Sequence, residues 1–277
     1  MYNRMSLRPP LCRVGSKKRF AEMLTHILPA HRVYVEPFAG SAAIFFYKDP
    51  AEFEVLNDLD KDITTTYRLI QKLPYKTEFP DLDTDEKVLA FHTKKTKTMT
   101  EQLVEQLIRA CGGWMGKMVK PEGKLQQYPN PFHKLQQFAE YKKRLSGVHV
   151  TNQDYEKVIK DNDSKDAVFF MDPPYEESTG LTYAKGSDAF DFIRFMKVVS
   201  KIKGKWLITI NDSPYIRTLF KQYNIVPVII VGHHKATGNA NTAKTIGTDD
   251  RPELLIANYP IPADIKEFAP KNVKFRA

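Results

Sequence analysis

Seven short apolar runs recur along the chain, with polar or amphipathic stretches between them. The runs cover residues 32–38, 53–58, 147–152, 167–172, 206–212, 226–231 and 253–259. Runs of this length, rich in β-branched and aromatic residues, predict buried strands. The stretch 61–73 instead places Ile63, Tyr67 and Ile70 at the spacing of one helix face, so it predicts a helix. Strands that alternate with helical stretches predict an α/β sheet.

The pattern changes between residues 74 and 145, where polar helical text and a loop-like stretch replace the apolar runs. We therefore predict a catalytic α/β domain, built from residues 1–73 and 146–277, that carries an inserted, mainly helical domain at 74–145. From Lys94 to Arg144 the insertion holds eleven Lys or Arg residues and four Glu residues. A second polar stretch, 232–250, lies between the last two apolar runs and predicts a long hairpin loop.

The composition is that of a soluble globular protein. Hydrophobic residues make up 42% and charged residues 27% of the 277 residues, which argues against a disordered or fibrous chain. The formal net charge of +9 favours a polyanionic partner, with nucleic acid as the first candidate. A generally basic surface would give the same net charge.

The cysteines and the N-terminus bear on the compartment. Cys12 and Cys111 lie in unrelated contexts, so we expect neither a disulfide framework nor a cysteine metal site, and a reducing compartment fits best. The N-terminal stretch lacks the apolar run of a signal peptide, and no segment reaches the roughly 18 consecutive apolar residues of a membrane span. We therefore expect a cytoplasmic protein with no membrane partner.

Acidic residues mark the carboxyl ends of four predicted strands: Glu36, Asp58, Asp154 and Asp172. In an open α/β sheet the ligand crevice lies outside the carboxyl ends of the strands, so we expect these side chains to meet there. Asp58 follows Glu36 by 22 residues, and an acidic residue about 20 residues after a glycine turn commonly binds the ribose hydroxyls. This spacing favours a cofactor that contains a nucleoside.

The glycine turn after the first strand indicates which cofactor. Dinucleotide sites use G-x-G-x-x-G, whereas FAGSAAIFF has Gly40 alone and Ala42 where a second glycine would lie. We expect Glu36 to repel phosphate, and no G-x-x-x-x-G-K-[ST] loop is present. A cofactor with a ribose and no phosphate fits better, and S-adenosylmethionine has that composition. A strand-to-helix turn with a satisfied carboxylate is the alternative for residues 36–41.

The run at 167–172 leads into the segment Asp172, Pro173, Pro174 and Tyr175. Proline fixes its own φ and disfavours the α conformation in the residue before it, so this segment leaves the strand extended and stiff. A planar group with an exocyclic NH₂ suits it, because the carboxylate and a carbonyl accept the amino hydrogens and the tyrosine stacks on the ring. Stacking contributes roughly 1 to 3 kcal/mol per base, which helps to offset the few kcal/mol needed to extrude a base from a duplex.

Those contacts suggest a reaction. Fixed acceptors draw the amino hydrogens and encourage the conjugated lone pair to localise on nitrogen. The nitrogen can then attack a methyl group in line. Positioning and electrostatics suffice for this reaction, and no metal is needed. The argument does not specify the polymer. DNA adenine, RNA adenine or another planar amino group would fit, and a catalytically silent DNA-binding protein is the alternative outside the enzymes. Alone, DPPY would also be explained by an ordinary turn.

Six motifs together resemble the Dam-type (D12 class) DNA adenine N6-methyltransferases. In chain order they are RVGSKKRF, VEPFAGSAAIFF, VLNDLD, TNQDYEKV, MDPPY and LITIND. The similarity spans about residues 8 to 258. It implies a Rossmann-like S-adenosylmethionine-dependent methyltransferase sheet, with the insertion acting as a target recognition domain. The family usually has glycine where Ser16 and Ala42 stand, and an aromatic residue where Arg13 stands.

The resemblance also implies roles for individual residues. The catalytic residues that hold the target adenine would be Asp172, Pro173, Pro174 and Tyr175. Those that bind S-adenosylmethionine would be Arg13, Lys17, Glu36, Pro37, Phe38, Gly40, Ser41, Asp58, Asp154, Tyr155 and Asp172.

We expect double-stranded DNA to contact basic residues of the insertion and of the polar 232–250 stretch, which suits a nucleic-acid backbone. The expected contacts are Lys117, Lys120, Lys124, Lys142, Lys143, Arg144, His233, His234, Lys235 and Lys244. A solvated helical face is the alternative for the insertion. The histidines have no cysteine or paired carboxylate nearby, so we expect no metal site.

Overall fold

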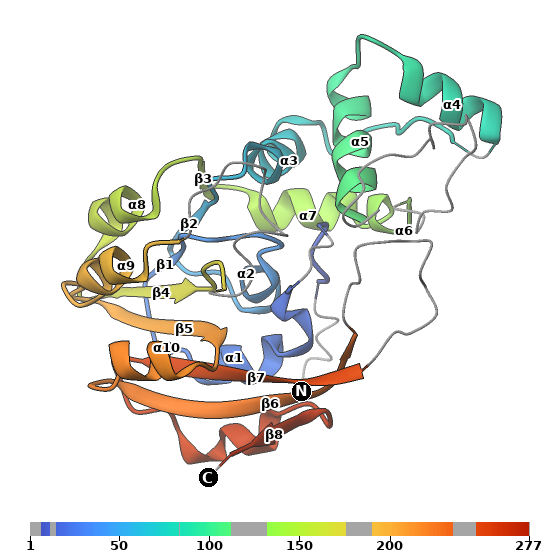
Figure 1. The fold of residues 1–277 in the computed structure, drawn as a ribbon. Helices are drawn as coiled ribbons and strands as arrows, with labels where there is room; N and C mark the ends of the chain where they lie inside the picture. Colours follow the sequence, from blue (N-terminus) through green and yellow to red (C-terminus); the bar gives the residue numbers. More distant parts are fainter. Residues whose placement is uncertain are drawn as a thin grey trace.

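The computed structural model describes residues 7–11, 15–82, 84–111, 132–175, 190–234 and 248–276. An eight-stranded sheet of order β3-β2-β1-β4-β5-β7-β6-β8 forms its centre (Figure 1). The strands are β1 (Val33–Glu36), β2 (Phe53–Asn57), β3 (His149–Thr151), β4 (Ala167–Met171), β5 (Lys205–Asn211), β6 (Asn224–His234), β7 (Thr248–Ala257) and β8 (Val273–Phe275). Strands β1 to β5 pair in parallel, whereas β7 is antiparallel to both β5 and β6.

Helices cover both faces of the sheet. They are α1 (Ala21–His26), α2 (Ala43–Tyr47), α3 (Lys61–Lys72), α4 (Asp85–Thr93), α5 (Met99–Cys111), α6 (Phe132–Leu135), α7 (Phe138–Leu145), α8 (Tyr155–Asn162), α9 (Phe192–Val199) and α10 (Pro214–Leu219), with the 3₁₀ helices η1 (Lys17–Arg19) and η5 (Ala263–Phe268). Within the described ranges, every helix is too short or too polar to cross a membrane.

Side chains along each strand alternate between the two faces of the sheet, and each face has its own hydrophobic core. Tyr34 of β1 faces a core shared with α1, α2 and α3, whereas its neighbour Val35 faces a core shared with α8, α9 and α10. In β4, Val168 and Phe170 join the first core, and Phe169 joins the second. Side chains of successive strand residues point to opposite faces. Because both faces are covered, the strands are apolar throughout, which explains the continuous runs in the sequence.

The predicted α/β fold is confirmed, and each of the seven apolar runs contains a strand. The order β3-β2-β1-β4-β5 is that of a doubly wound sheet, and the antiparallel β7 between β5 and β6 distinguishes it from the dinucleotide-binding order. The carboxyl ends of β1 to β5 lie at the same edge because these strands are parallel. This edge is where an open α/β sheet binds its ligands.

The hairpin of β6 and β7 is longer than the sequence predicted. Strand β6 continues through the polar residues to His234, and pairing resumes after an irregularity, with His233 opposite Asp249 and His234 opposite Thr248. Assigning both histidines to a loop was therefore wrong, because backbone pairing with β7 extends the strand beyond its apolar run. Residues 235–247 lie outside the described ranges. Strand β8, which the sequence did not predict, pairs with β6.

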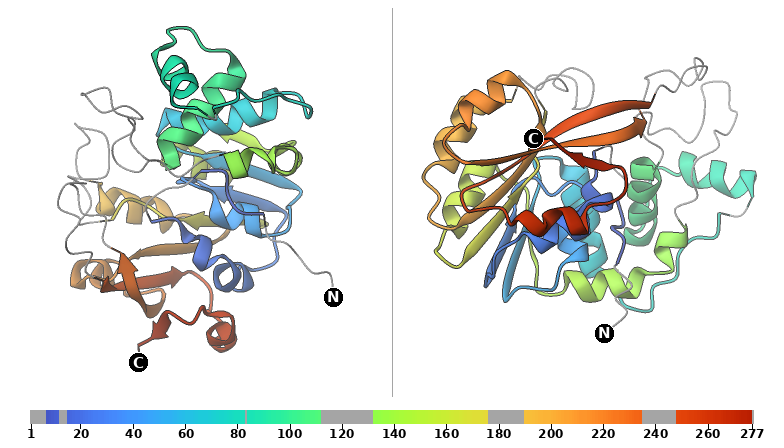
Figure 2. Two further views of the ribbon diagram at one scale, coloured as in Figure 1. Left: turned by 90° about the vertical axis from the view of Figure 1, so that its right-hand side faces the viewer. Right: turned by 90° about the horizontal axis from the view of Figure 1, so that it is seen from below.

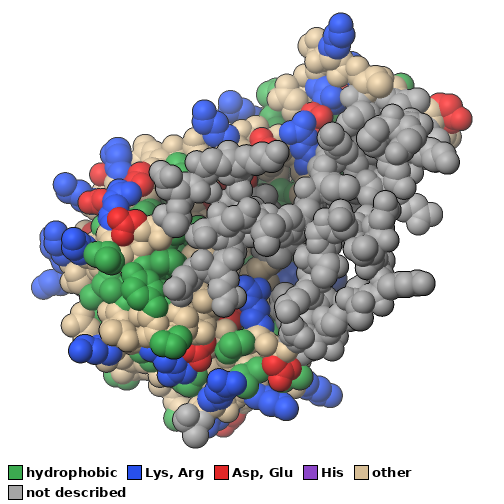
Figure 3. Space-filling model, viewed as in Figure 1, with side chains coloured by type: hydrophobic (Ala, Val, Ile, Leu, Met, Phe, Trp, Pro, Cys, Tyr) green, Lys and Arg blue, Asp and Glu red, His purple; other side chains and the backbone are tan. Residues whose placement is uncertain are grey.

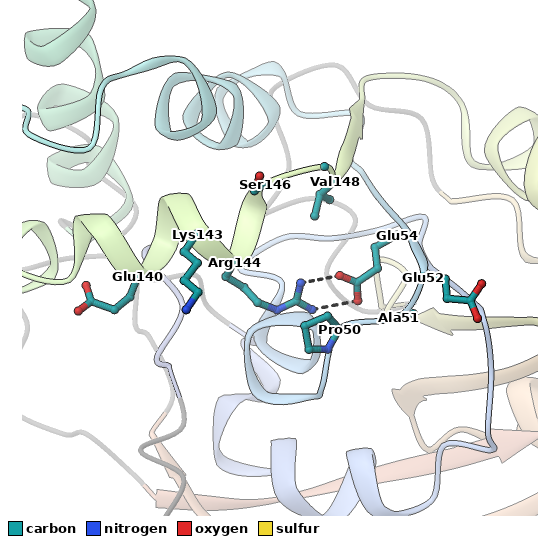
Figure 4. Close-up of a pocket in the computed structure, with 10 residues that line it drawn as sticks. Pro50, Ala51, Glu52, Glu54, Glu140, Lys143, Arg144, Ser146 and Val148 are labelled. Atoms are coloured by element: carbon teal, nitrogen blue, oxygen red, sulfur yellow. Dashed lines mark hydrogen bonds and ion pairs between the residues drawn. The ribbon is translucent and has the colours of Figure 1, made fainter.

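The predicted insertion contains α4 to α7. Figures 1 and 2 place α4 and α5 away from the sheet, and both α5 and α7 pack against α3. Arg144 at the end of α7 donates to the main-chain oxygen of Phe45 at 2.8 Å and to Glu54 Oε1 at 2.9 Å. Lys48 Nζ lies 2.7 Å from the same Glu54 oxygen. This buried ion cluster fastens the last helix of the insertion to β2 and α2 (Figure 4).

Candidate active site

The carboxyl ends of β1, β2, β3 and β4 bring most of the sequence-predicted site residues to one edge of the sheet. Asp172 to Tyr175 follow β4, Pro37 to Ser41 follow β1, Asp58 follows β2, and Asp154 with Tyr155 follows β3. Lys17 reaches this edge from η1, before the first strand. Arg13 lies outside the described residues.

Lys17 and Asp172 form the centre of this edge. The Lys17 ammonium lies 2.9 Å from each carboxylate oxygen of Asp172, 3.0 Å from the main-chain oxygen of Gly15 and 2.8 Å from the Tyr175 hydroxyl. An ammonium has three hydrogens, so these acceptors use all of them. Thr209 of β5 donates to Asp172 Oδ1 at 3.0 Å. The Asp172 carboxylate is thus held from two sides.

Partial exposure makes the Asp172 carboxylate accessible, since 23% of its side chain remains exposed against 4% for Lys17. Burial raises the pKa of Asp172, and the Lys17 ammonium opposes that rise by favouring the ionised form. Pro173 is buried and Pro174 is partly buried beside it. A rigid acceptor with one open side is the result.

Tyr175 has more partners than the sequence indicated. Its hydroxyl accepts from Lys17 at 2.8 Å and donates to Glu253 Oε1 of β7 at 2.9 Å, and the Arg251 guanidinium lies 4.4 Å from the ring centroid. The ring is 8% exposed, and its burial beside Glu253 and Asp172 raises the pKa of the hydroxyl well above its usual value. Both the hydroxyl and the ring of Tyr175 therefore have partners inside the protein.

The turn after β1 is built around Asp58. Its two oxygens accept the backbone N–H groups of Gly40, at 2.8 Å, and Asp60, at 2.9 Å. Tyr67 of α3 donates to the carbonyl of Gly40 at 2.8 Å. Gly40 has a φ of 49°, and Ala42 also takes a left-handed φ, of 52°, at the N-cap of α2. This turn presents the half-buried Asp58 carboxylate at the crevice.

Glu36 does not face the crevice. Its carboxyl is 1% exposed and accepts from the Tyr34 hydroxyl at 2.7 Å and from the Phe45 N–H at 2.9 Å. Burial raises the pKa of Glu36 to about 8. The expectation that the Glu36 side chain faces the crevice was wrong, because the side chain is buried beneath the turn; contact of the 36–41 turn with the cofactor stays a prediction. Glu36 supports the turn from inside.

Asp154 and Tyr155 lie beside Phe38 in an aromatic group. The Phe38 ring centroid is 5.3 Å from that of Tyr155 and 5.8 Å from that of Phe190. Asp154 caps α8 by accepting from the Glu156 N–H at 3.0 Å, and it pairs with Arg194 of α9 at 2.7 Å. Burial raises the pKa of Tyr155 to about 12. Flat apolar surface and a paired carboxylate thus meet next to the Asp58 turn.

Several residues at this edge were missed by the sequence interpretation. Asn57, 1% exposed, donates to the carbonyls of Pro37 and Gln153 at 2.9 Å and so joins the ends of β1, β2 and β3. Ser16, which was not predicted to belong to the site, hydrogen-bonds to the predicted Ser41 at 2.7 Å. Thr209 and Glu253 are polar residues inside the apolar runs at 206–212 and 253–259, and this was the available signal. Arg251 lies outside the apolar runs, and its sequence context did not indicate a place in the site.

The predicted DNA-contacting residues are only partly described. Lys142 donates to the Gln71 carbonyl at 2.6 Å, and Arg144 belongs to the buried cluster with Glu54, so Arg144 does not face a DNA surface as expected. Lys143 is exposed. Lys117, Lys120, Lys124, Lys235 and Lys244 lie outside the described residues, as do the side chains of His233 and His234.

On the face shown in Figure 3, charged side chains are dispersed among the described residues. In Figure 3 the Lys and Arg side chains are spread over the visible face, with Asp and Glu among them. Within the described ranges, no group of three or more His, Cys, Asp or Glu side chains could hold a metal ion.

Comparison with protein families places the motifs in context. The model of the D12 class N6 adenine-specific DNA methyltransferases matches residues 14–107 and 120–230. The chain belongs to this family. The match confirms the predicted enzyme class: the D12 methyltransferase transfers a methyl group to N6 of adenine in DNA, with S-adenosylmethionine as the donor.

Two curated relatives align over almost their whole length. The type II methyltransferase M1.LlaDCHI of Lactococcus lactis subsp. cremoris is 23% identical over 293 residues, covering 93% of this chain and 97% of the relative. The type II methyltransferase M.MjaIII of Methanocaldococcus jannaschii is 26% identical over 300 residues, covering 92% of this chain and 100% of the relative.

Solved structures show weaker likeness. A putative RNA methyltransferase of Pyrococcus horikoshii is 10% identical, with a TM-score of 0.37 over 88% of this chain and 81% of that one. A putative methyltransferase of Streptococcus mutans, in complex with SAH, is 8% identical with a TM-score of 0.34 over 86% and 94%. With TM-scores this low, neither likeness carries an argument about this chain.

Proposed function

We propose that this D12 methyltransferase acts on double-stranded DNA and draws the target adenine out of the duplex into a pocket formed by Asp172, Pro173, Pro174 and Tyr175. The single observation that carries the proposal is the Asp172 carboxylate, rigidly held by Lys17 at 2.9 Å and by Thr209 at 3.0 Å yet 23% exposed. A fixed, accessible acceptor is what an exocyclic amino group needs for orientation.

Asp172 accepts one amino hydrogen of the adenine, and the extended segment after it offers carbonyl oxygens for the other. Lys17 keeps Asp172 ionised and in place, so that electron density on the amino nitrogen is directed at the methyl group. The Tyr175 ring, one face of which is covered by the Arg251 guanidinium at 4.4 Å, lines the proposed pocket beside the base. These groups are preorganised before substrate arrives, so no reorganisation is needed at the moment of reaction.

The fit of S-adenosylmethionine rests on the donors and acceptors at the ends of β1 and β2. Asp58 presents carboxylate lone pairs for ribose hydroxyls, and Gly40 lets the backbone approach closely because it has no Cβ. Pro37 and Ser41 stay in the proposed set. Phe38 and Tyr155 offer apolar ring surface to an adenine, with Asp154 at its edge. When bound, S-adenosylmethionine supplies the methyl group from its sulfonium. Lys17 contributes to the cofactor site indirectly, by holding the Asp172 carboxylate in place.

We propose further that the insertion, residues 74–145, and residues 233–247 hold the duplex. The supporting observations are the Lys and Arg content of the insertion and the position of α4 and α5, which project away from the sheet (Figures 1 and 2). Lys117, Lys120, Lys124, Lys143, Lys235 and Lys244 stay in the proposed set, together with His233 and His234. Lys142 and Arg144 leave it, because both side chains are used inside the chain.

The test is methyl transfer from labelled S-adenosylmethionine to duplex DNA, single-stranded DNA, RNA and protein, with N6-methyladenine identified by mass. We expect label in duplex DNA at one short sequence. A fluorescent adenine analogue at the target position reports extrusion. Its fluorescence should increase when the protein binds. Preferential labelling of RNA would replace the proposed substrate, and a dark analogue during full turnover would contradict extrusion.

A further inference from the structure

Glu253 is a buried carboxylate that the proposed mechanism leaves without a role. It lies on β7 opposite Asn211 of β5, is 4% exposed, and receives a hydrogen bond of 2.9 Å from the Tyr175 hydroxyl. A carboxylate removed from water is costly unless it is paired or hydrogen-bonded. Because Glu253 contacts Tyr175 of the candidate site, it can influence the geometry of that site as well as the packing of the core.

The direction of the hydrogen bonds links Glu253 to Asp172. Lys17 can only donate, so at 2.8 Å the Tyr175 oxygen is the acceptor. The single hydrogen of the hydroxyl therefore goes to Glu253. One chain of contacts then runs from Glu253 through Tyr175 and Lys17 to Asp172, and each member has one arrangement that satisfies its neighbours.

Arg251 completes the hold on the tyrosine. Its Nε lies 3.6 Å from Glu253 Oε1, and its guanidinium lies 4.4 Å from the centroid of the Tyr175 ring. Strand β7 thus contacts Tyr175 at the hydroxyl, through Glu253, and at one face, through Arg251. Rotation of the ring out of this plane would break both contacts.

We propose that Glu253 is a positioning residue for methyl transfer: it fixes the hydroxyl of Tyr175 and thereby the ammonium of Lys17 that orients Asp172. This inference rests on the proposed roles of Asp172 and Tyr175. It gives the antiparallel strand β7 a part in the reaction although no atom of Glu253 touches substrate. Losing Glu253 lets Tyr175 and Lys17 adopt several arrangements, so fewer encounters have the Asp172 acceptor in place.

The experiment is a double-mutant cycle with Glu253→Gln and Tyr175→Phe, assayed for kcat, for KM of both substrates and for Tm. We expect each single variant to lower kcat about tenfold, because a hydrogen bond to a charged group is lost, with little change in KM. The double variant should lose no more than either single variant, since both changes break the same link. Multiplied losses would overturn the proposal, as would full kcat in either variant.

A second readout separates positioning from folding. The charge of Glu253 raises the pKa of Asp172, and Lys17 lowers it. Tyr175→Phe keeps the charge of Glu253 and breaks only the link to Lys17, so it should move the acid limb of the kcat profile to higher pH, and an unmoved limb would overturn the positioning role. If Glu253→Gln does not fold, Tyr175→Phe decides alone, and full kcat in that variant overturns the proposal.

The matched control is Glu54→Gln. It neutralises a similarly buried carboxylate near the amino end of β2, away from the candidate site. It should lower Tm and leave kcat and its pH profile unchanged. Asp172→Asn distinguishes the two levels of inference. If that variant is inactive while Glu253→Gln is normal, only the role of Glu253 fails; if it keeps full activity, the proposed function of the pocket fails.

Discussion

Lys17 and Asp172 are 155 positions apart in the chain, yet the lysine ammonium lies 2.9 Å from both carboxylate oxygens of the aspartate. The contact joins the segment before the first strand to the end of the central strand β4. Because Lys17 is almost fully buried, it cannot be solvated instead, and its removal would leave Asp172 as an uncompensated charge. The acceptor of the candidate site therefore depends on the N-terminal segment.

Asp172→Asn should lower kcat by about a hundredfold or more while the protein stays folded. The amide keeps the size of the side chain and an oxygen for Thr209 but loses the charge that draws the amino hydrogens. Single-turnover methyl transfer and circular dichroism check the two parts. Undiminished turnover would remove Asp172 from the reaction. Asp172→Ala should be as inactive and less stable.

The pH dependence of the same step provides a second prediction. Burial raises the pKa of Asp172, so the acid limb of kcat should lie above the pH at which an ordinary aspartate titrates. Lys17→Met removes the cation that lowers this pKa, and we expect the limb to move to higher pH. A limb that does not move, in a variant with measurable turnover, would contradict the pairing as the cause.

Asp58→Ala should weaken S-adenosylmethionine binding, with roughly 1.5 to 3 kcal/mol lost for a hydrogen bond to a charged group. DNA affinity without cofactor should barely change. The control is Asp163→Ala, since Asp163 likewise accepts two backbone N–H groups, from Lys203 and Gly204, at the opposite edge of the sheet. Calorimetry should show weaker cofactor binding for Asp58→Ala alone. Equal losses in both variants would assign Asp58 a purely structural role.

Glu36→Gln should flatten the pH dependence of stability. The folded pKa of about 8 exceeds the unfolded value of 4.5, so the contribution of this carboxyl is fully present below pH 4.5 and is lost as the pH rises through 8. Between these values the difference between wild type and variant should change by up to about 1.4 kcal/mol per pH unit. Urea unfolding at pH 5, 6.5 and 8 measures it. A constant difference would contradict a protonated Glu36.

Ala42→Gly should be less destabilising than Ala43→Gly by about 1 kcal/mol, because glycine relieves the left-handed backbone at one position and weakens a helix start at the other. Both alanines are buried, with Ala42 at a φ of 52° and Ala43 the first residue of α2. The free energies of unfolding of the two variants give the comparison. Equal losses would show that Ala42 is unstrained.

The insertion predicts a salt effect. Neutralising Lys120 and Lys124 together should flatten the slope of log affinity against log salt by about 1.8, at about 0.9 per phosphate contact, and weaken binding to all sequences alike. Lys203→Ala with Lys205→Ala is the charge-matched control, since both are exposed at the far edge of the sheet. An identical slope change in both double variants would reduce the effect to net charge.

Much of the fold was predictable because the strands of a covered sheet must be apolar along their whole length, and such runs are easily recognised. Glu36 shows where this reasoning failed: a strand-end carboxylate looks the same in sequence whether it faces the crevice or lies beneath the turn. His233 and His234 were misplaced because pairing with β7, not composition, determines where β6 ends. Glu253 was overlooked because its partner, Tyr175, is 78 positions away.

The ion cluster of Lys48, Glu54 and Arg144, of which Figure 4 shows the Glu54–Arg144 pair, has a consequence for exchanging the insertion between relatives. A graft that replaced residues 74–145 as a whole would remove Arg144 and leave the buried Glu54 carboxylate paired with Lys48 alone, which should lower the stability of the chimera. A graft that ended before Phe138 would retain α7 and the cluster. On the proposed role of the insertion, chimeras of the second kind should stay folded and take the donor's preferred site, and the exchangeable segment would then be shorter than the stretch of unusual composition.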